Sequence, residues 1–378
     1  MRDIVILGST GSIGVQALEV IAANPELFRV VGLSAGGNNL TLLSKQVRDF
    51  NVPIVGVSSG VQELKSALSG VKVIDGAQAS EQIASLTCDL VLNAITGSIG
   101  LGPTLAALAS GNKVALANKE SLVAGGDLVM AYGSEKIIPV DSEHSALFQA
   151  MSAGRASDVS KLILTASGGP FRDRQDLSKV KLADALAHPT WSMGPVVTIN
   201  SATLVNKGLE IIEAHYLFDI AYSKIEAVIH PQSIVHSLVE FKDGSTLAQA
   251  SPPDMKGPIA YALAYPNRVA GAMAPINWSA KQSWDFEPID EKRFPAVQLA
   301  RRAGALGSSV AAVYNAANEV AVAAFMKDEI AFTAIVDTIE KVVDKLSASA
   351  PSRIRDISDV SAIEKDARIY AKEVLKKG

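Results

Sequence analysis

Near its start the chain carries a glycine-rich turn between a predicted strand and a predicted helix. Ile4 to Leu7 is an aliphatic run rich in β-branched residues, and a helical stretch from Val15 to Asn24 follows the turn Gly8-Ser-Thr-Gly11-Ser-Ile-Gly14. Such glycines let backbone N–H groups approach an anion where the helix dipole favours negative charge. The spacing is G-x-x-G-x-x-G, and glycines also make ordinary tight turns, but the flanking strand and helix favour a dinucleotide-binding unit.

Strand and helix patterns alternate through this first part of the chain. Further apolar strands are predicted at Arg29 to Ser34, Ile54 to Val57, Leu90 to Ala94, Lys113 to Ala117 and Ile137 to Val140. This alternation is typical of a parallel sheet covered by helices on both faces. The predicted fold class is α/β, beginning with a Rossmann-like, doubly wound domain.

The end of the second predicted strand indicates which dinucleotide binds. The segment from Ser34 to Asn39 contains no Asp or Glu to hold the ribose hydroxyls of NAD, so NADP is favoured. The same turn also lacks a basic residue for a 2′-phosphate. Neutral donors such as Asn38 and Asn39 would have to bind the 2′-phosphate instead.

Charge and cysteine content exclude several classes of function. The 378 residues carry a net charge of −4 without a dense Lys/Arg block, which argues against nucleic acid or an anionic membrane as partner. The single cysteine, Cys88, forms no internal disulfide. Because the chain starts with a strand and shows no bilayer-spanning apolar run, we expect a cytoplasmic protein.

Two carboxylates, Asp141 and Glu143, stand where the nucleotide-binding pattern ends. We expect the run Lys136 to Val140 to be a strand that continues extended, so that residues i and i+2 face the same side. Both acids could then bind one hard cation such as Mg²⁺ or Mn²⁺. A solvated strand end is the alternative, because Asp-x-Glu is a short motif.

The middle of the chain contains candidate anion-binding groups. Ser167-Gly168-Gly169 follows a predicted strand from Lys161 to Thr165 and suits either an anion-binding nest or a plain turn. Asn200 to Leu217 is predicted to be one helix capped by Ser201. Asn206, Lys207 and Glu210 would share one face of it, as a ligand site or as an exposed Lys-Glu pair.

The remaining segments complete the domain prediction. His188 to Pro195 is a loop with Trp191 and Met193, which would either anchor in the core or close over a ligand. Pro266 to Pro288 reads as a connector, and helices are predicted at Ser308 to Met326, Ile330 to Leu346 and Val360 to Lys376. We predict a nucleotide-binding domain (1–141), an α+β catalytic and dimerisation domain with a flexible flap (142–265), a linker (266–290) and a C-terminal helical bundle (291–378).

Six of these motifs, in order, resemble those of the deoxyxylulose-phosphate reductoisomerase family. They are the glycine turn, Ala117-Asn-Lys-Glu-Ser121, Val140-Asp-Ser-Glu-His144, Ser167-Gly-Gly-Pro170, His188-Pro-Thr-Trp-Ser-Met-Gly194 and Asn206-Lys-Gly-Leu-Glu210. The resemblance implies a three-domain homodimer that uses NADPH and a divalent metal. It also implies conversion of 1-deoxy-D-xylulose 5-phosphate into 2-C-methyl-D-erythritol 4-phosphate, in non-mevalonate isoprenoid biosynthesis.

The resemblance assigns a role to each matching residue. The metal ligands are Asp141, Glu143 and Glu210, and the catalytic groups are Lys119, Glu143 and Glu210. The residues assigned to binding of the substrate phosphate are Ser167, Ser201, Asn206 and Lys207, and those around the carbon skeleton are Lys119, Ser142, Glu143, His188 and Glu210. The residues assigned to NADPH binding are Thr10, Gly11, Ser12, Ile13, Gly36, Gly37, Asn38, Asn118, Glu120 and Gly194, and the flap contains Trp191 and Met193. Position 37 is glycine where some members carry lysine, which leaves the 2′-phosphate contact least secure.

Two other functions fit parts of this pattern. A simple metal-assisted dehydrogenase of a phosphorylated sugar would oxidise an alcohol without carbon migration. A non-catalytic nucleotide sensor would need neither converging carboxylates nor a flap. Product analysis separates the first from a reductoisomerase, and turnover excludes the second.

Overall fold

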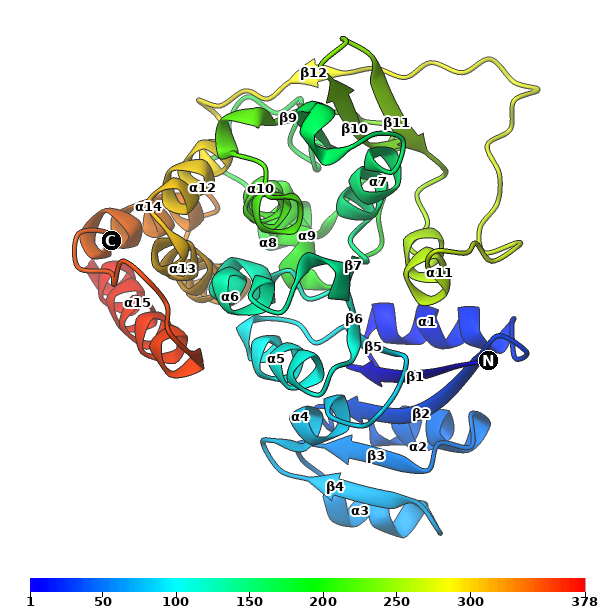
Figure 1. The fold of residues 1–378 in the computed structure, drawn as a ribbon. Coiled ribbons are helices and arrows are strands. Elements are labelled where there is room, and N and C mark those ends of the chain that lie inside the picture. The colour runs from blue at the N-terminus through cyan, green and yellow to red at the C-terminus, as the bar shows by residue number, and fades with distance from the viewer. Residues whose placement is uncertain (378) are drawn as a thin grey trace. The chain divides into compact units, whose positions relative to one another are not determined.

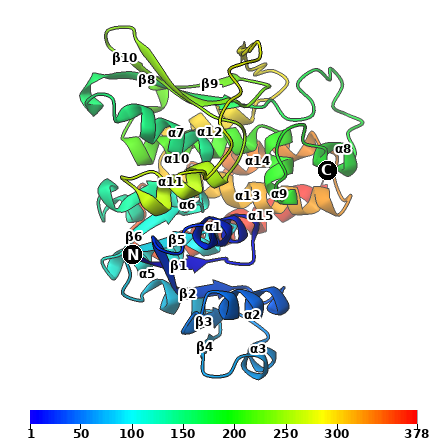
Figure 2. The same ribbon diagram turned by 90° about the vertical axis from the view of Figure 1, so that its right-hand side faces the viewer.

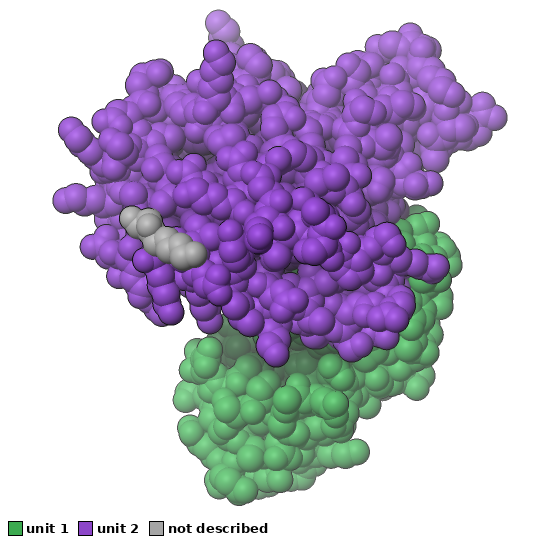
Figure 3. Space-filling model, turned by 90° about the vertical axis from the view of Figure 1, so that its left-hand side faces the viewer, with its two compact units in different colours: residues 1–121, 129–145, 254–274 green, residues 122–128, 146–253, 275–378 purple. Residues whose placement is uncertain are grey.

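The structure, a computed structural model, describes residues 1–377 and divides into two compact units (Figure 3). Unit 1 comprises residues 1–121, 129–145 and 254–274, and unit 2 comprises residues 122–128, 146–253 and the chain from 275 onward. Two helices, α6 (Glu120–Met130) and α7 (Ser142–Met151), contain residues of both units. The division into three domains with a linker stays a prediction.

Unit 1 is built on a parallel sheet of seven strands in the order β4-β3-β2-β1-β5-β6-β7 (Figure 1). The chain starts in the middle and moves outward in two directions, so the order reverses between β1 and β5. Ligands of doubly wound sheets bind at such a point, beyond the carboxyl ends of the strands. The strands are β1 (Arg2–Leu7), β2 (Phe28–Ala35), β3 (Ile54–Val57), β4 (Lys72–Asp75), β5 (Leu90–Asn93), β6 (Lys113–Leu116) and β7 (Ile137–Pro139).

The helices of unit 1 cover this sheet, so that β3, β5 and β7 are buried along their whole length, whereas the edge strand β4 is partly exposed. Residues Ile4 to Leu7 of β1 are fully buried, which explains why the strand is aliphatic without alternation. The helices are α1 (Ser12–Ala22), α2 (Leu40–Asp49), α3 (Val61–Ala67), α4 (Ala79–Ala84), α5 (Leu101–Ala109) and α11 (Lys256–Ala264), with 3₁₀ turns at Ser98–Gly100 and Ser134–Lys136. The sequence predicted every strand of this sheet except β4.

Helix α11 joins unit 1 from a distant part of the sequence. Lys256 Nζ lies 2.7 Å from Glu19 Oε2 on α1. The Arg2 guanidinium donates to the carbonyl oxygens of Leu263 and Tyr265 at 3.0 and 2.7 Å. These contacts tie the segment to the start of β1 and to α1.

Unit 2 contains a mixed five-stranded sheet in the order β11-β10-β8-β9-β12. Strands β8 and β9 run parallel, and the other neighbours are antiparallel. The strands are β8 (Val159–Ala166), β9 (Ile225–Ile229), β10 (Val235–Phe241), β11 (Thr246–Ala250) and β12 (Glu287–Pro288). Helices α8 (Leu182–Leu186), α9 (Pro195–Ala202) and α10 (Val205–Phe218) and 3₁₀ turns at Ala156–Asp158 and Tyr222–Lys224 complete this part.

The C-terminal part of unit 2 is a helical bundle, as predicted (Figures 1 and 2). Arg368 on the last helix pairs with Glu319 of α13 at 2.7 Å, which joins two helices of the bundle. The bundle consists of α12 (Ala296–Ala305), α13 (Ser308–Met326), α14 (Ala334–Leu346) and α15 (Ile357–Lys377). Within residues 1–377 we find no helix that combines the length and the apolar character needed to cross a bilayer.

Two local predictions were wrong. The predicted single helix from Asn200 to Leu217 is two helices, because Leu204 adopts a left-handed conformation (φ +59°); Ser201 therefore lies inside the last turn of α9 and is no cap. Asp141 and Glu143 do not lie on an extended segment, since β7 ends at Pro139 and α7 begins at Ser142. Ser145 N–H donates to the Asp141 carbonyl at 2.8 Å, which closes the first turn of α7.

Candidate active site

The glycine turn of unit 1 joins the end of β1 to the start of α1. Gly8 has φ +74°, and a Cβ there would lie 2.6 Å from the Ala94 carbonyl oxygen. A Cβ on Gly14 would lie 2.5 Å from the Gly8 carbonyl oxygen. Both positions therefore require glycine. Gly11 caps the eleven-residue helix α1 and is exposed together with Ser12, so the unpaired N–H groups of the first turn face outward, where an anion can reach them.

The turn after β2 contains the residues expected to contact the far end of the cofactor. Gly36 and Asn38 are exposed. Gly37 has φ +104°, and a Cβ there would lie 2.4 Å from Ser59 Oγ and 2.5 Å from the Ser59 carbonyl oxygen. Asn39 Oδ1 accepts from Leu42 N–H at 3.0 Å, so this side chain caps α2. The backbone thus explains why position 37 is glycine here.

Asn118 and Glu120 lie together beside a loop that the sequence prediction missed. The Asn118 side-chain amide donates to Glu120 Oε2 at 2.8 Å and to the carbonyl oxygens of Ile95 and Gly97 at 2.7 and 2.9 Å. The Ile95–Gly97 loop follows β5, the strand next to β1. Because parallel strands end at one edge, the position of β5 was the available signal that this loop borders the nucleotide site.

Lys119 and Asp141 form a largely buried ion pair in unit 1. Their side chains are 12% and 14% exposed, and Lys119 Nζ lies 2.5 Å from Asp141 Oδ2. Burial alone would raise the pKa of the Asp141 carboxyl, but the charges of Lys119 and His144 and hydrogen bonds with Lys119 and Glu143 hold this pKa well below its ordinary value. Asp141 is therefore ionised at neutral pH, as a metal ligand must be.

Ser142 and Glu143 open helix α7 next to this pair. Ser142 Oγ donates to Glu143 Oε2 at 2.6 Å. Glu143 is half-buried in the first helical turn, where the helix dipole stabilises a negative charge. Lys119, Asp141 and Glu143 thus follow two neighbouring strands, β6 and β7, at the carboxyl edge of the sheet.

In unit 2, the turn after β8 orients a serine hydroxyl. Two backbone N–H groups, those of Thr190 and Trp191, donate to His188 Nδ1 at 3.1 and 2.9 Å. This nitrogen therefore carries no proton, and Nε2–H is the donor to Ser167 Oγ at 2.9 Å. Gly169 N–H also donates to Ser167 Oγ, at 3.2 Å. The hydroxyl accepts twice, so its own hydrogen is directed to a further acceptor.

The same turn packs against the end of α9. Gly168 and Gly169 have φ values of +82° and +64°, and a Cβ on Gly169 would lie 3.0 Å from the Ser201 carbonyl oxygen. Burial lowers the pKa of His188 below its ordinary value. The neutral imidazole that the hydrogen bonds require is thus the favoured form near neutral pH.

Helix α10 presents the predicted polar face at its start. Asn206 Nδ2 and Lys207 Nζ both donate to the Glu210 carboxylate, and the Lys207 and Glu210 side chains are 3% and 1% exposed. The prediction that these three residues share a face is confirmed, and the alternative of a solvent-exposed Lys-Glu pair is wrong. Such deep burial of a charged pair is uncommon and is typical of functional sites.

The predicted flap is a loop between α8 and α9. Trp191 and Met193 are half-buried, and the Trp191 ring lies 6.1 Å from the His236 ring in a tilted arrangement. The loop ends at Gly194, which caps α9 ahead of Pro195. His188 is its anchor, since both ring nitrogens are bound.

Unit 1 therefore gathers the glycine turn, Asn118, Glu120 and the Lys119–Asp141 pair along one edge of its sheet. Unit 2 gathers Ser167, His188, Ser201 and the acid–amide–lysine face of α10. The fold and these groups define an α/β dinucleotide-binding protein with buried cationic and acidic groups suited to a phosphorylated ligand.

Comparison with known proteins identifies the family. Residues 4–126 match the 1-deoxy-D-xylulose 5-phosphate reductoisomerase family, residues 137–218 match the C-terminal domain of 1-deoxy-D-xylulose 5-phosphate reductoisomerase, and residues 250–370 match the DXP reductoisomerase C-terminal domain. The chain is 52% identical to the 1-deoxy-D-xylulose 5-phosphate reductoisomerase of Kitasatospora griseola, over 98% of this chain and 99% of that protein. It is 56% identical to that of Mycobacterium marinum, over 94% and 89%.

Solved structures agree with this result. A DOX-P reductoisomerase in complex with NADPH, fosmidomycin and magnesium has a TM-score of 0.93 and 36% identity, over 100% of this chain and 98% of that one. The reductoisomerase from Zymomonas mobilis in complex with NADPH has a TM-score of 0.92 and 40% identity, over 99% of both chains. This chain belongs to the 1-deoxy-D-xylulose 5-phosphate reductoisomerase family.

Proposed function

We propose that this chain converts 1-deoxy-D-xylulose 5-phosphate into 2-C-methyl-D-erythritol 4-phosphate, using NADPH and Mg²⁺ or Mn²⁺. The observation that carries the proposal is the Lys119–Asp141 pair at the carboxyl edge of the dinucleotide sheet. It supplies an ionised metal-binding carboxylate and a cation on the same sheet edge as the glycine turn. A protein that only sensed a nucleotide would not require these groups beside the cofactor.

The residues of unit 1 fit NADPH. The turn from Gly8 to Gly14 leaves no room for side chains at either end and exposes the N-terminus of α1, as a pyrophosphate requires. When bound, NADPH supplies the hydride that reduces the rearranged aldehyde. We assign its binding to Thr10, Gly11, Ser12, Ile13, Gly36, Gly37, Asn38, Asn118 and Glu120 of unit 1 and to Gly194 of unit 2.

The acidic residues fit a hard divalent cation. Asp141 and Glu143 come from unit 1, and the assignment of Glu210 as third ligand rests on the family resemblance. Carboxylate oxygens are the ligands that Mg²⁺ and Mn²⁺ prefer. When bound, the metal polarises the substrate's ketone and acidifies its neighbouring hydroxyl, which favours either a retro-aldol/aldol sequence or an alkyl shift.

The residues of unit 2 fit the substrate phosphate. Ser167 directs its hydroxyl hydrogen away from His188 and Gly169, and Lys207 and Asn206 supply donors at the start of α10. We assign the phosphate to these three residues and Ser201. Because the phosphate is remote from the reacting carbons, its binding energy orients them.

Two residues of unit 1 act on protons and charge. Lys119 stabilises the negative charge that develops on the substrate oxygens, since its ammonium is held in place by Asp141 in a largely buried site. Glu143 transfers a proton to or from the substrate hydroxyl, with Ser142 as its hydrogen-bond partner. Ser142, His188 and Glu210 complete the surroundings of the carbon skeleton, and Trp191 and Met193 on the flap exclude water.

The test is NADPH oxidation by the purified protein with deoxyxylulose phosphate and Mg²⁺ or Mn²⁺. We expect turnover that a chelator abolishes and that added metal restores. Carbon NMR of the product should show the branched methylerythritol skeleton. An oxidised or reduced sugar with an unbranched skeleton would instead identify a dehydrogenase, and a folded protein that binds NADPH without turnover would refute the catalytic proposal.

The solved complex of a DOX-P reductoisomerase with NADPH, fosmidomycin and magnesium supports a small phosphorylated ligand for this chain. The homodimer and the cytoplasmic location stay predictions. Light scattering of the purified chain tests the homodimer.

A further inference from the structure

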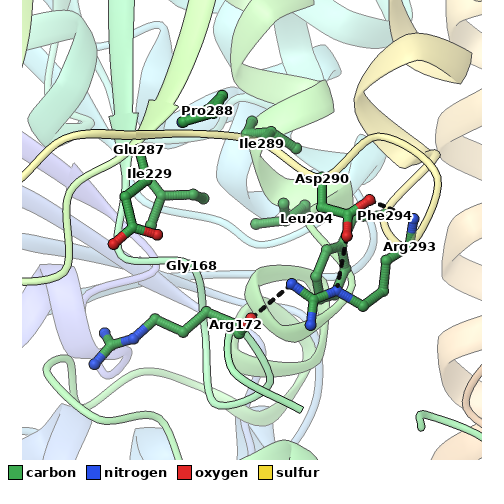
Figure 4. Close-up of a pocket in the computed structure, with 10 residues that line it drawn as sticks. All are labelled: Gly168, Arg172, Leu204, Ile229, Glu287, Pro288, Ile289, Asp290, Arg293 and Phe294. Carbon is green, nitrogen blue, oxygen red and sulfur yellow. Dashed lines mark hydrogen bonds and ion pairs between the residues drawn. The ribbon is translucent and has the colours of Figure 1, made fainter. Parts of the chain in front are cut away.

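Arg293, which precedes helix α12, binds the backbone of the loop that follows the Ser167–Gly169 turn of unit 2 (Figure 4). Its guanidinium donates to the carbonyl oxygens of Arg172 and Arg174 at 2.6 and 2.9 Å. Asp290 orients it, with Oδ2 at 3.4 Å from Nε and Oδ1 accepting from the Arg293 backbone N–H at 3.2 Å. The Arg293 side chain is 17% exposed, and both bonds are partly buried.

A small pocket of about 40 Å³ lies between the turn and the connection from β12 to α12. Gly168, Leu204, Ile229, Asp290 and Phe294 are among the residues that line it. The two hydrogen bonds of Arg293 join the turn's loop to this connection beside the pocket.

A second attachment holds the same loop from another direction. The Phe171 ring is buried and meets the Phe332 ring edge-on, with centroids 5.0 Å apart. Phe332 in turn contacts Phe325 on α13 at 5.8 Å. The loop is thus held by the buried Phe171 ring and by Arg293 at the Arg172 and Arg174 carbonyls, and the Arg174 side chain also pairs with Asp184 at 3.4 Å. Without the Arg293 hydrogen bonds, we expect the loop to stay folded and to shift about Phe171.

The loop begins three residues after the Ser167 hydroxyl. The two left-handed glycines between them are closely surrounded, since a Cβ on Gly168 would lie 3.0 Å from the Ile229 side chain and 3.1 Å from Arg172 Cβ. Gly169 binds Ser167 Oγ through its N–H and packs on the Ser201 carbonyl. We therefore expect a shift of the loop to move the Gly169 N–H and, through their hydrogen bond, the Ser167 hydroxyl.

We infer that Arg293 is a positioning residue for phosphate recognition: its two hydrogen bonds to the Arg172 and Arg174 carbonyls hold the Ser167–Gly169 turn in the geometry that binds the substrate phosphate. The inference rests on the proposed function, which places the phosphate at Ser167. It gives the C-terminal bundle, which contains none of the proposed binding residues, a part in substrate affinity through the segment that leads into α12.

The test compares Arg293→Met with wild type in steady-state kinetics. We expect KM for deoxyxylulose phosphate to rise about tenfold, as for the loss of one hydrogen bond between the displaced turn and the charged phosphate, with kcat within about a factor of two and NADPH affinity unchanged. The inhibition constant for inorganic phosphate, used as a competitive probe, should rise in parallel. Arg293→Lys keeps the charge but cannot bind two carbonyls in a fork, so it should restore part of the affinity.

Arg302→Met is the matched control. Arg302 lies on α12 in the same bundle, is 46% exposed and pairs with Glu340 and Asp344, so its loss should leave KM unchanged. An unchanged KM in Arg293→Met, or a loss of kcat without a change in phosphate inhibition, would overturn the inference. If wild type binds inorganic phosphate but does not turn over, the proposed reaction fails, and the ratio of phosphate dissociation constants for wild type and Arg293→Met, measured by calorimetry, still decides the role of Arg293.

Discussion

Each unit contains a buried lysine paired with a carboxylate, and the two pairs are built in different ways. Lys119 and Asp141 follow the neighbouring strands β6 and β7, so the tertiary fold brings them together. Lys207 and Glu210 lie three residues apart on one turn of α10. The first pair depends on the register of a sheet, and the second depends on a single helix.

The two pairs also differ in their access to water. The side chains of Lys119 and Asp141 are 12% and 14% exposed, whereas those of Lys207 and Glu210 are 3% and 1% exposed. Removing one partner from a fully buried pair typically costs about 3–5 kcal/mol of stability, because a charge is left uncompensated. The pair in unit 2 should therefore be the more sensitive to substitution, and the pair in unit 1 leaves room for chemistry beside it.

The largest effect is expected for Glu210→Gln, which removes the charge of the proposed third metal ligand. We expect kcat to fall by about 10³-fold, since the metal contributes several kcal/mol to the transition state. NADPH affinity should stay within about a factor of two, because the proposed cofactor residues lie almost entirely in unit 1. Single-turnover kinetics and a fluorescence titration with NADPH measure these two quantities.

Glu226→Gln is the control for this substitution. Glu226 lies on β9 of the same unit, is 53% exposed and pairs with Lys161 at 3.1 Å, so its loss should leave kcat unchanged. A large fall of NADPH affinity in Glu210→Gln would contradict the division of roles between the units.

Lys119→Met tests the pair in unit 1. We expect kcat to fall by about 10²–10³-fold through loss of the group that stabilises oxyanion charge, with a smaller change in KM. The pKa of the Asp141 carboxyl should rise toward its ordinary value, and the metal concentration for half-maximal activity should increase at acidic pH. Kinetics at varied Mg²⁺ and pH measure both effects. Lys113→Met, at the exposed start of β6, is the control, and a pure KM effect in Lys119→Met would place Lys119 in substrate binding alone.

Lys207→Ala tests the pair in unit 2 and should give the opposite pattern. KM for deoxyxylulose phosphate should rise between about tenfold and 100-fold, the range for a hydrogen bond to a charged group, with a smaller fall in kcat. The melting temperature should also decrease, because Glu210 remains buried. Kinetics, phosphate inhibition and thermal unfolding provide the measurements. If Lys119→Met and Lys207→Ala change the same kinetic constant, the distinction between the two pairs disappears.

The same contrast explains what the sequence could predict. The three-residue spacing of Lys207 and Glu210 on a helical pattern was enough to predict a shared face, because helical geometry is local. The pairing of Lys119 with Asp141 was not predicted, since it requires the order of β6 and β7 in the sheet. The hydrogen bonds of Arg293 to the carbonyls of Arg172 and Arg174 could not be predicted for the same reason, since these residues lie more than a hundred positions earlier in the chain.

Local patterns also failed where packing determined the backbone. The residues around Leu204 favour a continuous helix, and only a left-handed leucine divides α9 from α10. A buried leucine at positive φ is intrinsically unfavourable, so tertiary contacts must enforce it. Similarly, the sequence from Pro139 to Glu143 predicted an extended segment, but the Asp141 carbonyl accepts the hydrogen bond that closes the first turn of α7. Strands of the parallel sheet were predicted well, because their burial on both faces makes them continuously apolar.

The smallest expected effect is a pH dependence of substrate binding through His188 in unit 2. Burial lowers the pKa of His188 below its ordinary value of 6.5, so the fold favours the neutral form. The hydrogen bonds of neutral His188 are complete at pH values above its ordinary pKa, and they are lost as the pH falls through its lowered pKa in the folded protein. Protonation at Nδ1 would displace the N–H groups of Thr190 and Trp191, which loosens the flap and the Ser167 hydroxyl.

We therefore expect KM for deoxyxylulose phosphate to rise as pH falls through the lowered pKa of His188, by at most tenfold per pH unit for one proton. The substrate phosphate itself titrates near pH 6, so wild type must be compared with His188→Asn, which has no titrating ring at this position. The variant should show a higher KM at neutral pH and a weaker pH dependence. Equal pH profiles would assign the whole effect to the substrate. A difference confined to kcat would instead give His188 a part in the chemical step, as proposed for Lys119 of unit 1, and would remove it from phosphate recognition in unit 2.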